Sequence, residues 1–144
     1  MTKLTLPIML ASLALAAPAL AQDAPALDVL TLDVELNALQ PSDAGCRLTF
    51  LATNRLGTEL TRSAFEIALF GSDGGIDRLV SLDFKTMPEG KTRVLQFELG
   101  QLDCANVSRV LVNDVVACEG EGLTPASCLA GLNPTSRLDV GFGV

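Results

Sequence analysis

Residues 30–37 have the sequence LTLDVELN, in which every second side chain is aliphatic and the side chains between are polar. Successive side chains of a β-strand point to opposite faces of a sheet, so this alternation predicts a strand with one buried face. The same pattern recurs along the chain. We therefore predict a mainly β protein.

Five more strands are predicted between residues 46 and 116, separated by polar and glycine-rich turns that favour chain reversal. The side chains expected to face inward are Cys46, Leu48, Phe50 and Ala52 in the second strand, Phe65, Ile67 and Leu69 in the third, Val80, Leu82 and Phe84 in the fourth, and Leu95, Phe97 and Leu99 in the fifth. Residues 107–116, rich in β-branched side chains, form the sixth. Short strands with such turns are typical of an antiparallel sandwich.

The C-terminal tail has a different pattern. Thr124 is a suitable N-cap, Pro125 is favoured in a first helical turn, and Gly131 is favoured at a helix end, so a short helical turn is predicted. The Asn-Pro pair at residues 133–134 predicts a turn. A seventh strand is then predicted from the alternating side chains Leu138, Val140 and Phe142.

The first 21 residues are predicted to be a cleaved export signal. Lys3 supplies a positive start, residues 4–15 are apolar, and a small-x-small cleavage site ends at Ala21. The apolar run is short for a membrane span. Residues 22–144 would then form a single β-sandwich domain, periplasmic or secreted, with no membrane span in the mature chain.

The processed chain would be acidic. It keeps nine of the ten basic residues against all seventeen acidic ones, because Lys3 is the only charged residue of the predicted leader. Nucleic acids and anionic lipid surfaces are bound by clusters of Lys and Arg. We therefore expect no nucleic-acid partner, and a protein or another envelope component instead.

All four cysteines lie in the predicted mature part. An even number of cysteines in an exported chain predicts disulfides, with three pairings to choose from. If successive strands run alternately up and down, Cys46 at the start of the second strand and Cys104 after the fifth lie at the same end. Cys118 closes the sixth strand at the other end, to which the tail returns Cys128. The predicted bonds are therefore Cys46–Cys104 and Cys118–Cys128, the second holding the tail.

Two turns carry a resemblance to a known family. Residues 69–74 (LFGSDG) and 87–92 (MPEGKT) give a strand, an acidic-Gly hairpin and a Pro-x-Gly turn. Residues 28–117 thereby resemble small immunoglobulin-like modules of bacterial envelope proteins, of the FxLYD type, although Phe70 and Gly71 stand where that pattern has Tyr-Asp. The resemblance implies a module that binds other proteins or acts as a spacer, without catalytic residues. The expected fold is all-β: an antiparallel immunoglobulin-like sandwich of about seven strands with a short helical turn in the C-terminal tail.

The composition leaves few routes to catalysis or metal binding. The chain has no histidine, so a serine or cysteine nucleophile would lack its usual base. Asp33 and Glu35 are a candidate carboxylate pair for glycoside hydrolysis, yet acids on the polar face of a strand are ordinarily just solvated. The acidic hairpin between Asp73 and Asp77 is the basis of an alternative function, small-ligand or cation binding, although calcium takes more oxygen ligands than two carboxylates provide. We expect no enzyme, no cofactor and no metal site.

Four apolar side chains are predicted to face outward from the second to fourth strands: Leu51, Ala68, Phe70 and Leu79. Together they would form a patch for a partner, unless the second sheet or the tail covers them. The sequence thus predicts an exported, non-enzymatic binding or interaction module.

Overall fold

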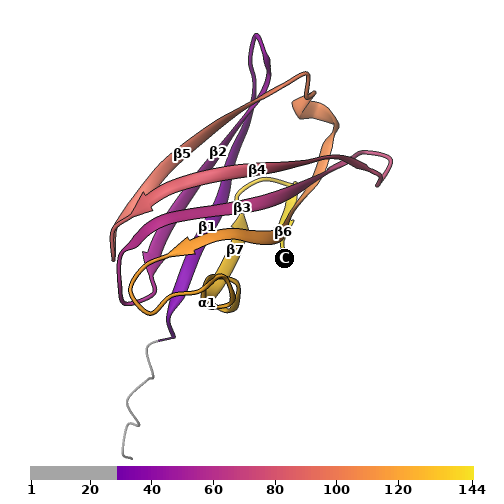
Figure 1. Cartoon of the computed structure of the whole chain (residues 1–144). Helices are drawn as coiled ribbons and strands as arrows, with labels where there is room; N and C mark the ends of the chain where they lie inside the picture. Colours follow the sequence, from indigo (N-terminus) through magenta and orange to yellow (C-terminus); the bar gives the residue numbers. More distant parts are fainter. Residues whose placement is uncertain (1–28) are drawn as a thin grey trace, which may run out of the picture.

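Two four-stranded sheets lie face to face in the structure, a computed structural model that describes residues 29–144 (Figure 1). One sheet has the strand order β5-β2-β1-β7 and the other β4-β3-β6-β8. The strands are β1 (Thr31–Pro41), β2 (Gly45–Arg55), β3 (Leu60–Gly71), β4 (Ile76–Met87), β5 (Thr92–Gly100), β6 (Val107–Glu119), β7 (Leu132–Ser136) and β8 (Gly141–Gly143). A 3-10 turn, η1 (Cys104–Asn106), precedes β6, and the helix α1 (Pro125–Gly131) follows it. The predicted leader, residues 1–21, lies outside the described residues.

The alternating pattern places the aliphatic side chains between the sheets. In β1, Leu32, Val34 and Leu36 are buried, and the residues between them are partly exposed. The inward faces predicted for β2 and β3 likewise belong to the core, as do Leu82 and Phe84 of β4, while Val80 of β4 and Phe97 and Leu99 of β5 are only partly buried against it. Burial of this aliphatic and aromatic surface is the main force that holds the two sheets together.

Aromatic rings occupy the middle of the core. The ring of Phe50 in β2 lies 5.5 Å from that of Phe84 in β4, 5.6 Å from that of Phe142 in β8 and 6.1 Å from that of Phe97 in β5. Phe65 in β3 packs edge-on against Phe84, with the ring centres 5.0 Å apart. Since these strands come from both sheets, the cluster joins the two layers.

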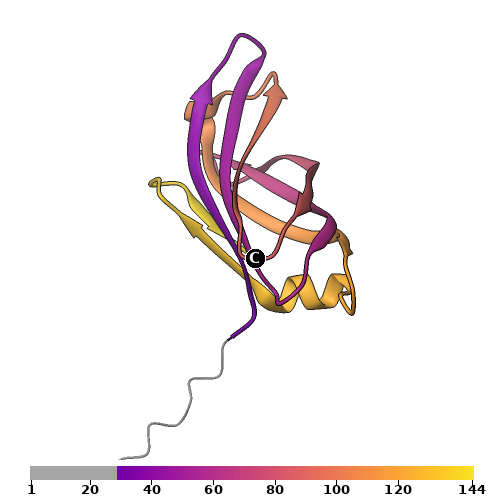
Figure 2. The same cartoon turned by 90° about the vertical axis from the view of Figure 1, so that its left-hand side faces the viewer.

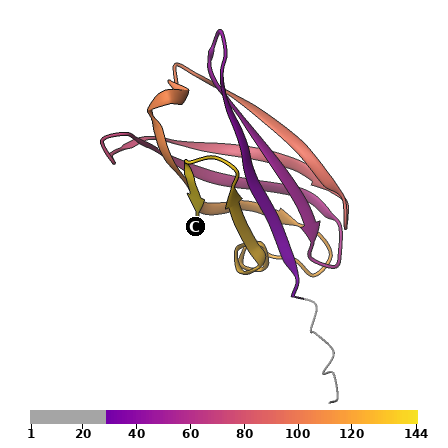
Figure 3. The same ribbon diagram turned by 180° about the vertical axis from the view of Figure 1, so that it is seen from behind.

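The sheets are mixed, which corrects the prediction of an antiparallel sandwich of about seven strands. β7 pairs with β1 in parallel, and β8 pairs with β6 in parallel. The chain still runs alternately up and down: β6 descends to α1, β7 ascends and β8 descends again (Figure 3). Each tail strand joins the sheet beside a strand of its own direction, so the pairing is parallel although the alternation is kept.

The tail differs from the prediction in three places. Residues 133–134 form no turn but belong to β7, where Pro134 pairs with Val34 at the edge of the sheet, a position that tolerates proline. Residues 138–142 are not one strand, since only Phe142 of the three predicted inward side chains lies in β8. The helix ends at Gly131 as predicted, but without a left-handed residue. A Cβ at position 131 would lie 2.8 Å from Leu56 Cδ2 and 3.2 Å from the Leu30 carbonyl oxygen, so glycine favours close packing there.

The helical turn itself is capped as the sequence predicts. The Thr124 hydroxyl accepts a hydrogen bond from the Ser127 amide, and Ser127 Oγ accepts one from the Thr124 amide. This reciprocal cap satisfies two amides that a helix start leaves without partners. α1 therefore begins at a defined position, at the end of the molecule opposite the β1–β2 hairpin (Figure 2).

Both disulfides have the predicted pairing. Cys46 of β2 is bonded to Cys104 of η1, and Cys118 at the end of β6 is bonded to Cys128 of α1. Both bonds fit the up-and-down alternation, because the first lies at the end where β2 begins and β5 finishes, and the second at the α1 end.

The long side of the sandwich between β4 and β5 is spanned by two arginines. Arg78 of β4 donates hydrogen bonds to the carbonyls of Gly100, the last residue of β5, and Gln101, the next residue, at 2.8 and 3.2 Å. Arg93 of β5 donates in the opposite direction, to the Thr86 carbonyl of β4. These charged donors cap backbone acceptors on two edge strands, which otherwise would offer templates for pairing with other chains.

Candidate functional site

The four apolar residues predicted to form one patch do not lie together. Leu51 is on the outer face of the β5-β2-β1-β7 sheet, beside Val94, and the other three are on β3 and β4 of the opposite sheet. Ala68 is also 1% exposed, so it is not a surface residue. Its cross-strand neighbours are Leu79 and Leu111, whose longer side chains share its face of the sheet. The small methyl group is therefore covered although it points outward.

Phe70 and Leu79 do belong to an apolar surface, which we call the sheet patch: Phe70, Ile76, Leu79, Leu111 and Arg109. Phe70 pairs with Ile76 of β4 and with Arg109 of β6. Two residues earlier in β3, Ala68 pairs with Leu79 and Leu111, so the two rows lie next to each other on the same face of the sheet. Leu79 is 53% and Ile76 62% exposed. Contiguous exposed apolar side chains of this kind mark sites of interaction.

A cation–π contact lies in the middle of the sheet patch. The guanidinium carbon of Arg109 is 5.2 Å from the centre of the Phe70 ring. Within residues 29–144, Arg109 forms no ion pair, so its donors remain available beside the aromatic surface. Aromatic and arginine side chains are the types enriched at the energetic centres of protein interfaces.

Sequence reasoning missed Arg109 and two apolar members of the patch, Ile76 and Leu111, the last two for different reasons. Counting every second residue back from Val80 places Ile76 on the inner face, but a bulge between Arg78 and Ile76 reverses its direction. Leu111 could have been found, because it stands between Val110 and Val112, which are both buried.

A second candidate site is an open groove of about 610 Å³ at the α1 end of the molecule. We call it the loop-end groove. Four segments line it: Leu30 before β1, residues 56–58 after β2, residues 121–123 after β6, and Ser127, Ala130 and Gly131 of α1. A smaller groove of about 340 Å³ adjoins it at Leu30 and is lined by Val29, Arg55, Glu89 and Gly90.

Asn54 holds the loops around this groove in place. Its side chain is fully buried and donates hydrogen bonds to the carbonyls of Thr58, at 2.8 Å, and Met87, at 2.9 Å. Its side-chain oxygen accepts a bond of 3.0 Å from the Leu56 amide. One amide group thus connects the β2–β3 loop to the end of β4, and the backbone carbonyl of Asn54 adds a bond from the Gly90 amide.

Replacing Asn54 with alanine should lower the free energy of unfolding by about 2 kcal/mol, because it leaves buried backbone groups of Leu56 and Met87 without partners. Urea denaturation would measure the change. The matched control is Asn113→Ala, which removes an amide group that, among residues 29–144, forms one solvent-exposed side-chain bond, to Glu66 Oε1, and should cost less than about 0.5 kcal/mol. Equal losses for the two variants would contradict the role assigned to Asn54.

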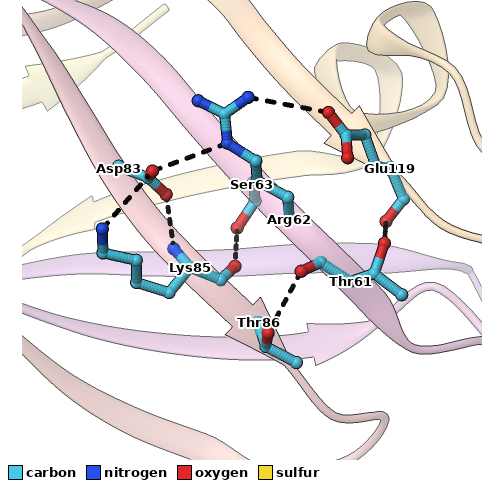
Figure 4. A network of polar contacts seen from close by, with 7 residues as sticks. All are labelled: Thr61, Arg62, Ser63, Asp83, Lys85, Thr86 and Glu119. Atoms are coloured by element: carbon cyan, nitrogen blue, oxygen red, sulfur yellow. Dashed lines mark hydrogen bonds and ion pairs between the residues drawn. The ribbon is translucent and has the colours of Figure 1, made fainter.

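A network of polar contacts fixes the neighbouring strand ends (Figure 4). Arg62 of β3 lies between Asp83 of β4, at 3.5 Å, and Glu119 of β6, at 3.7 Å. A hydrogen bond from the Lys85 backbone amide, together with the charges of Lys85 and Arg62, holds the pKa of Asp83 below its usual value. Arg62 and Lys85 are thus paired with carboxylates of the network. The network stabilises the strand ends and leaves neither cation free to bind a ligand.

The acidic hairpin does not bring several carboxylates together. Asp73 Oδ1 accepts a hydrogen bond of 2.9 Å from the Gly75 amide and so closes its own turn. Asp77 forms an ion pair of 2.7 Å with Arg78, and Asn106 Oδ1 accepts bonds from Ser72. In the described part of the chain, no group of three or more metal-ligating side chains gathers here or elsewhere. Both carboxylates are thus engaged by groups of their own hairpin.

The candidate carboxylate pair of β1 is engaged in a similar way. Burial tends to raise the pKa of Asp33, but hydrogen bonds from Asn133 and Arg55 outweigh this effect and hold the pKa below its usual value. A carboxyl group with a lowered pKa is a poor proton donor near neutral pH. Glu35 accepts a bond of 2.8 Å from the Asn37 amide group. Asp33 therefore connects β1 to β2 and β7, which is a structural role.

Further properties of the chain bear on where the protein works. All four cysteines are in disulfides, which persist in oxidising compartments outside the cytosol. Among residues 29–144, no helix has the length and apolar character needed to cross a membrane.

No model of a known protein family matches the chain, and no curated protein or solved structure is significantly similar to it.

Proposed function

We propose that this protein is an exported, non-enzymatic binding module of the periplasm that holds a protein partner on its sheet patch. The observation that carries the proposal is the exposed apolar surface around Phe70, with Arg109 stacked on the ring. A rigid aromatic side chain beside a cation provides a large contact area at little cost in conformational entropy.

The order of the first six strands supports an immunoglobulin-like fold, related to the small envelope modules that residues 28–117 resemble. In an immunoglobulin-like sandwich, the first, second and fifth strands share one sheet, and the third and sixth share the other. Here β5-β2-β1 and β3-β6 have this arrangement, with β4 beside β3. The parallel pairing of β8 with β6 departs from the pattern. The proposed fold is thus an immunoglobulin-like variant with an altered tail.

Export to the periplasm is supported by the predicted leader together with the two disulfides. The absence of histidine from the sequence and the structural use of Asp33 favour binding over catalysis. The engagement of Asp73 and Asp77 within their own hairpin makes cation binding the less well supported function.

A photocrosslinking amino acid at position 79 tests the proposal in cells that export the protein. We expect a defined covalent adduct with a second protein from position 79, and none from position 94. Val94 is a matched control because it is 63% exposed on the outer face of the other sheet. Ile76→Glu should reduce the adduct about tenfold, since it places a charge in the patch without touching the core.

A circular-dichroism spectrum and melting temperature like those of the wild type would show that Ile76→Glu is folded. Equal adducts from positions 79 and 94, or an adduct that survives Ile76→Glu unchanged, would refute the sheet patch as the binding surface.

A further inference from the structure

The loop-end groove has an apolar floor that the described part of the chain leaves open. Leu56, Leu123 and Leu30 line it, and Leu30 remains 56% exposed. The preceding residue, Val29, is 79% exposed and lines the adjoining groove. Two consecutive large apolar side chains at the surface, each beside a depression, provide a place for the apolar side chains of a ligand.

The shape of the depression suits an extended chain. Leu30 lines both the larger and the smaller groove, and their combined lining extends from α1 to the β4–β5 turn at Gly90. Gly57 and Gly122 leave the rim without side chains, and a Cβ at position 122 would meet nothing within 4 Å. A ligand backbone could therefore approach the protein backbone closely along this rim.

The groove also has an excess of free negative charge. Glu121 lines the larger groove and Glu89 lines the smaller one. Neither glutamate forms an ion pair within residues 29–144. Two nearby cations already have partners: Arg55 is paired with Asp33 at 3.0 Å, and Arg62 lies between Asp83 and Glu119. A ligand that brought its own positive charge would therefore gain a favourable interaction.

We propose that the loop-end groove binds an extended segment of another polypeptide in which aliphatic side chains stand next to Lys or Arg. The aliphatic side chains would lie against Leu30 and Leu56, and the cationic group would lie at Glu121. This site is separate from the sheet patch, which lies on the outer face of β3, β4 and β6. The protein would then bind one partner at the sheet patch and a second polypeptide at the loop-end groove at the same time.

The test uses the processed protein, with both disulfides formed, and a fluorescent peptide of alternating leucine and lysine as the probe. Fluorescence anisotropy should show saturable binding that weakens as salt is added, because the interaction is partly electrostatic. A peptide of alternating leucine and glutamate should bind about tenfold more weakly or not at all.

Substitutions assign the binding to the groove. Glu121→Lys, which reverses the charge, and Ala130→Trp, which fills the groove from α1, should each weaken binding of the leucine–lysine peptide about tenfold. Both positions are exposed, so the fold should be retained. Asp43→Lys, in the exposed β1–β2 turn at the other end, makes the same charge change as a control and should alter the affinity less than about twofold.

Three outcomes would overturn the proposal. Equal losses for Glu121→Lys and Asp43→Lys would mean that only the net charge matters. Loss of peptide binding in Ile76→Glu would place the peptide on the sheet patch instead. A chain that begins at Val29 and binds the peptide about tenfold more tightly than the processed chain would mean that residues 22–28 are the natural occupant of the groove.

Discussion

Loss of the Cys46–Cys104 disulfide is expected to lower the free energy of unfolding by about 4 kcal/mol, the value that chain entropy gives for a loop of this length. The two cysteines are 58 residues apart, and the chain between them contains β3, β4 and β5. Cys46 belongs to one sheet and η1 leads into β6 of the other. The bond therefore closes a long loop and reduces the number of conformations open to the unfolded chain.

Urea denaturation of the double variant Cys46→Ala, Cys104→Ala measures this loss. The matched control is Cys118→Ala, Cys128→Ala, which opens a loop with a separation of only 10 residues and should cost about 3 kcal/mol. The longer loop should thus have the larger effect. A reversed order, with the short loop costing more, would show that packing of the bonded sulfurs outweighs chain entropy.

Phe50→Ala is expected to destabilise the protein by about 4 kcal/mol, through lost burial and the cavity that remains. The ring is fully buried and lies within about 6 Å of rings from three other strands. Because two of these rings, Phe84 and Phe142, belong to the opposite sheet, the cavity would open between the layers, where neither sheet can close it alone.

Thermal and urea unfolding, compared with the wild type, would measure the effect. Phe70→Ala is the appropriate control, because it removes the same side chain from the surface of the molecule and should cost about 1 kcal/mol. If both phenylalanines gave similar losses, the aromatic cluster would not be the energetic centre of the core. Either large effect would be a substantial part of the 5–15 kcal/mol by which domains are ordinarily stable.

The strands could be predicted from the sequence because their buried faces follow a local rule. Leu32, Val34 and Leu36 follow this rule, because they are every second residue of β1 and all three are buried. The disulfides could also be predicted, since pairing depended only on which end of the sandwich each cysteine occupies. That argument holds for any sheet assignment as long as no strand is missed, and the two late strands, β7 and β8, follow all four cysteines.

The tail could not be predicted in the same way, because the edge that a short strand joins depends on the surface already formed there. Pro134 is unfavourable in a central strand and acceptable in β7 only because β7 is at an edge. Nothing in the local sequence states that condition. The same limit applies to Ala68, whose burial depends on Leu79 and Leu111 across two different strand pairs.

The candidate sites depend on still more distant relations. A bulge in β4 directs Ile76 to the sheet patch, and bulges are not visible in a period-two count. The loop-end groove draws on segments that are separated by most of the chain, from Leu30 to Gly131. In the sequence, these loops are marked by glycines: Gly57 and Gly122 have a positive φ, and a Cβ at Gly120 would lie 2.4 Å from the Glu59 carbonyl oxygen.

The last residues of the chain have an effect on the motions of the whole molecule. β7 lengthens one sheet and β8 the other, with only residues 137–140 between them, while Arg78 and Arg93 cross the opposite flank. The two sheets are thus connected along both sides: by the chain itself between β7 and β8, and by the arginine hydrogen bonds between β4 and β5. The two sheets therefore cannot separate along one side to let a ligand into the core. Amide hydrogens of the inner strands should exchange with solvent only when the entire protein unfolds.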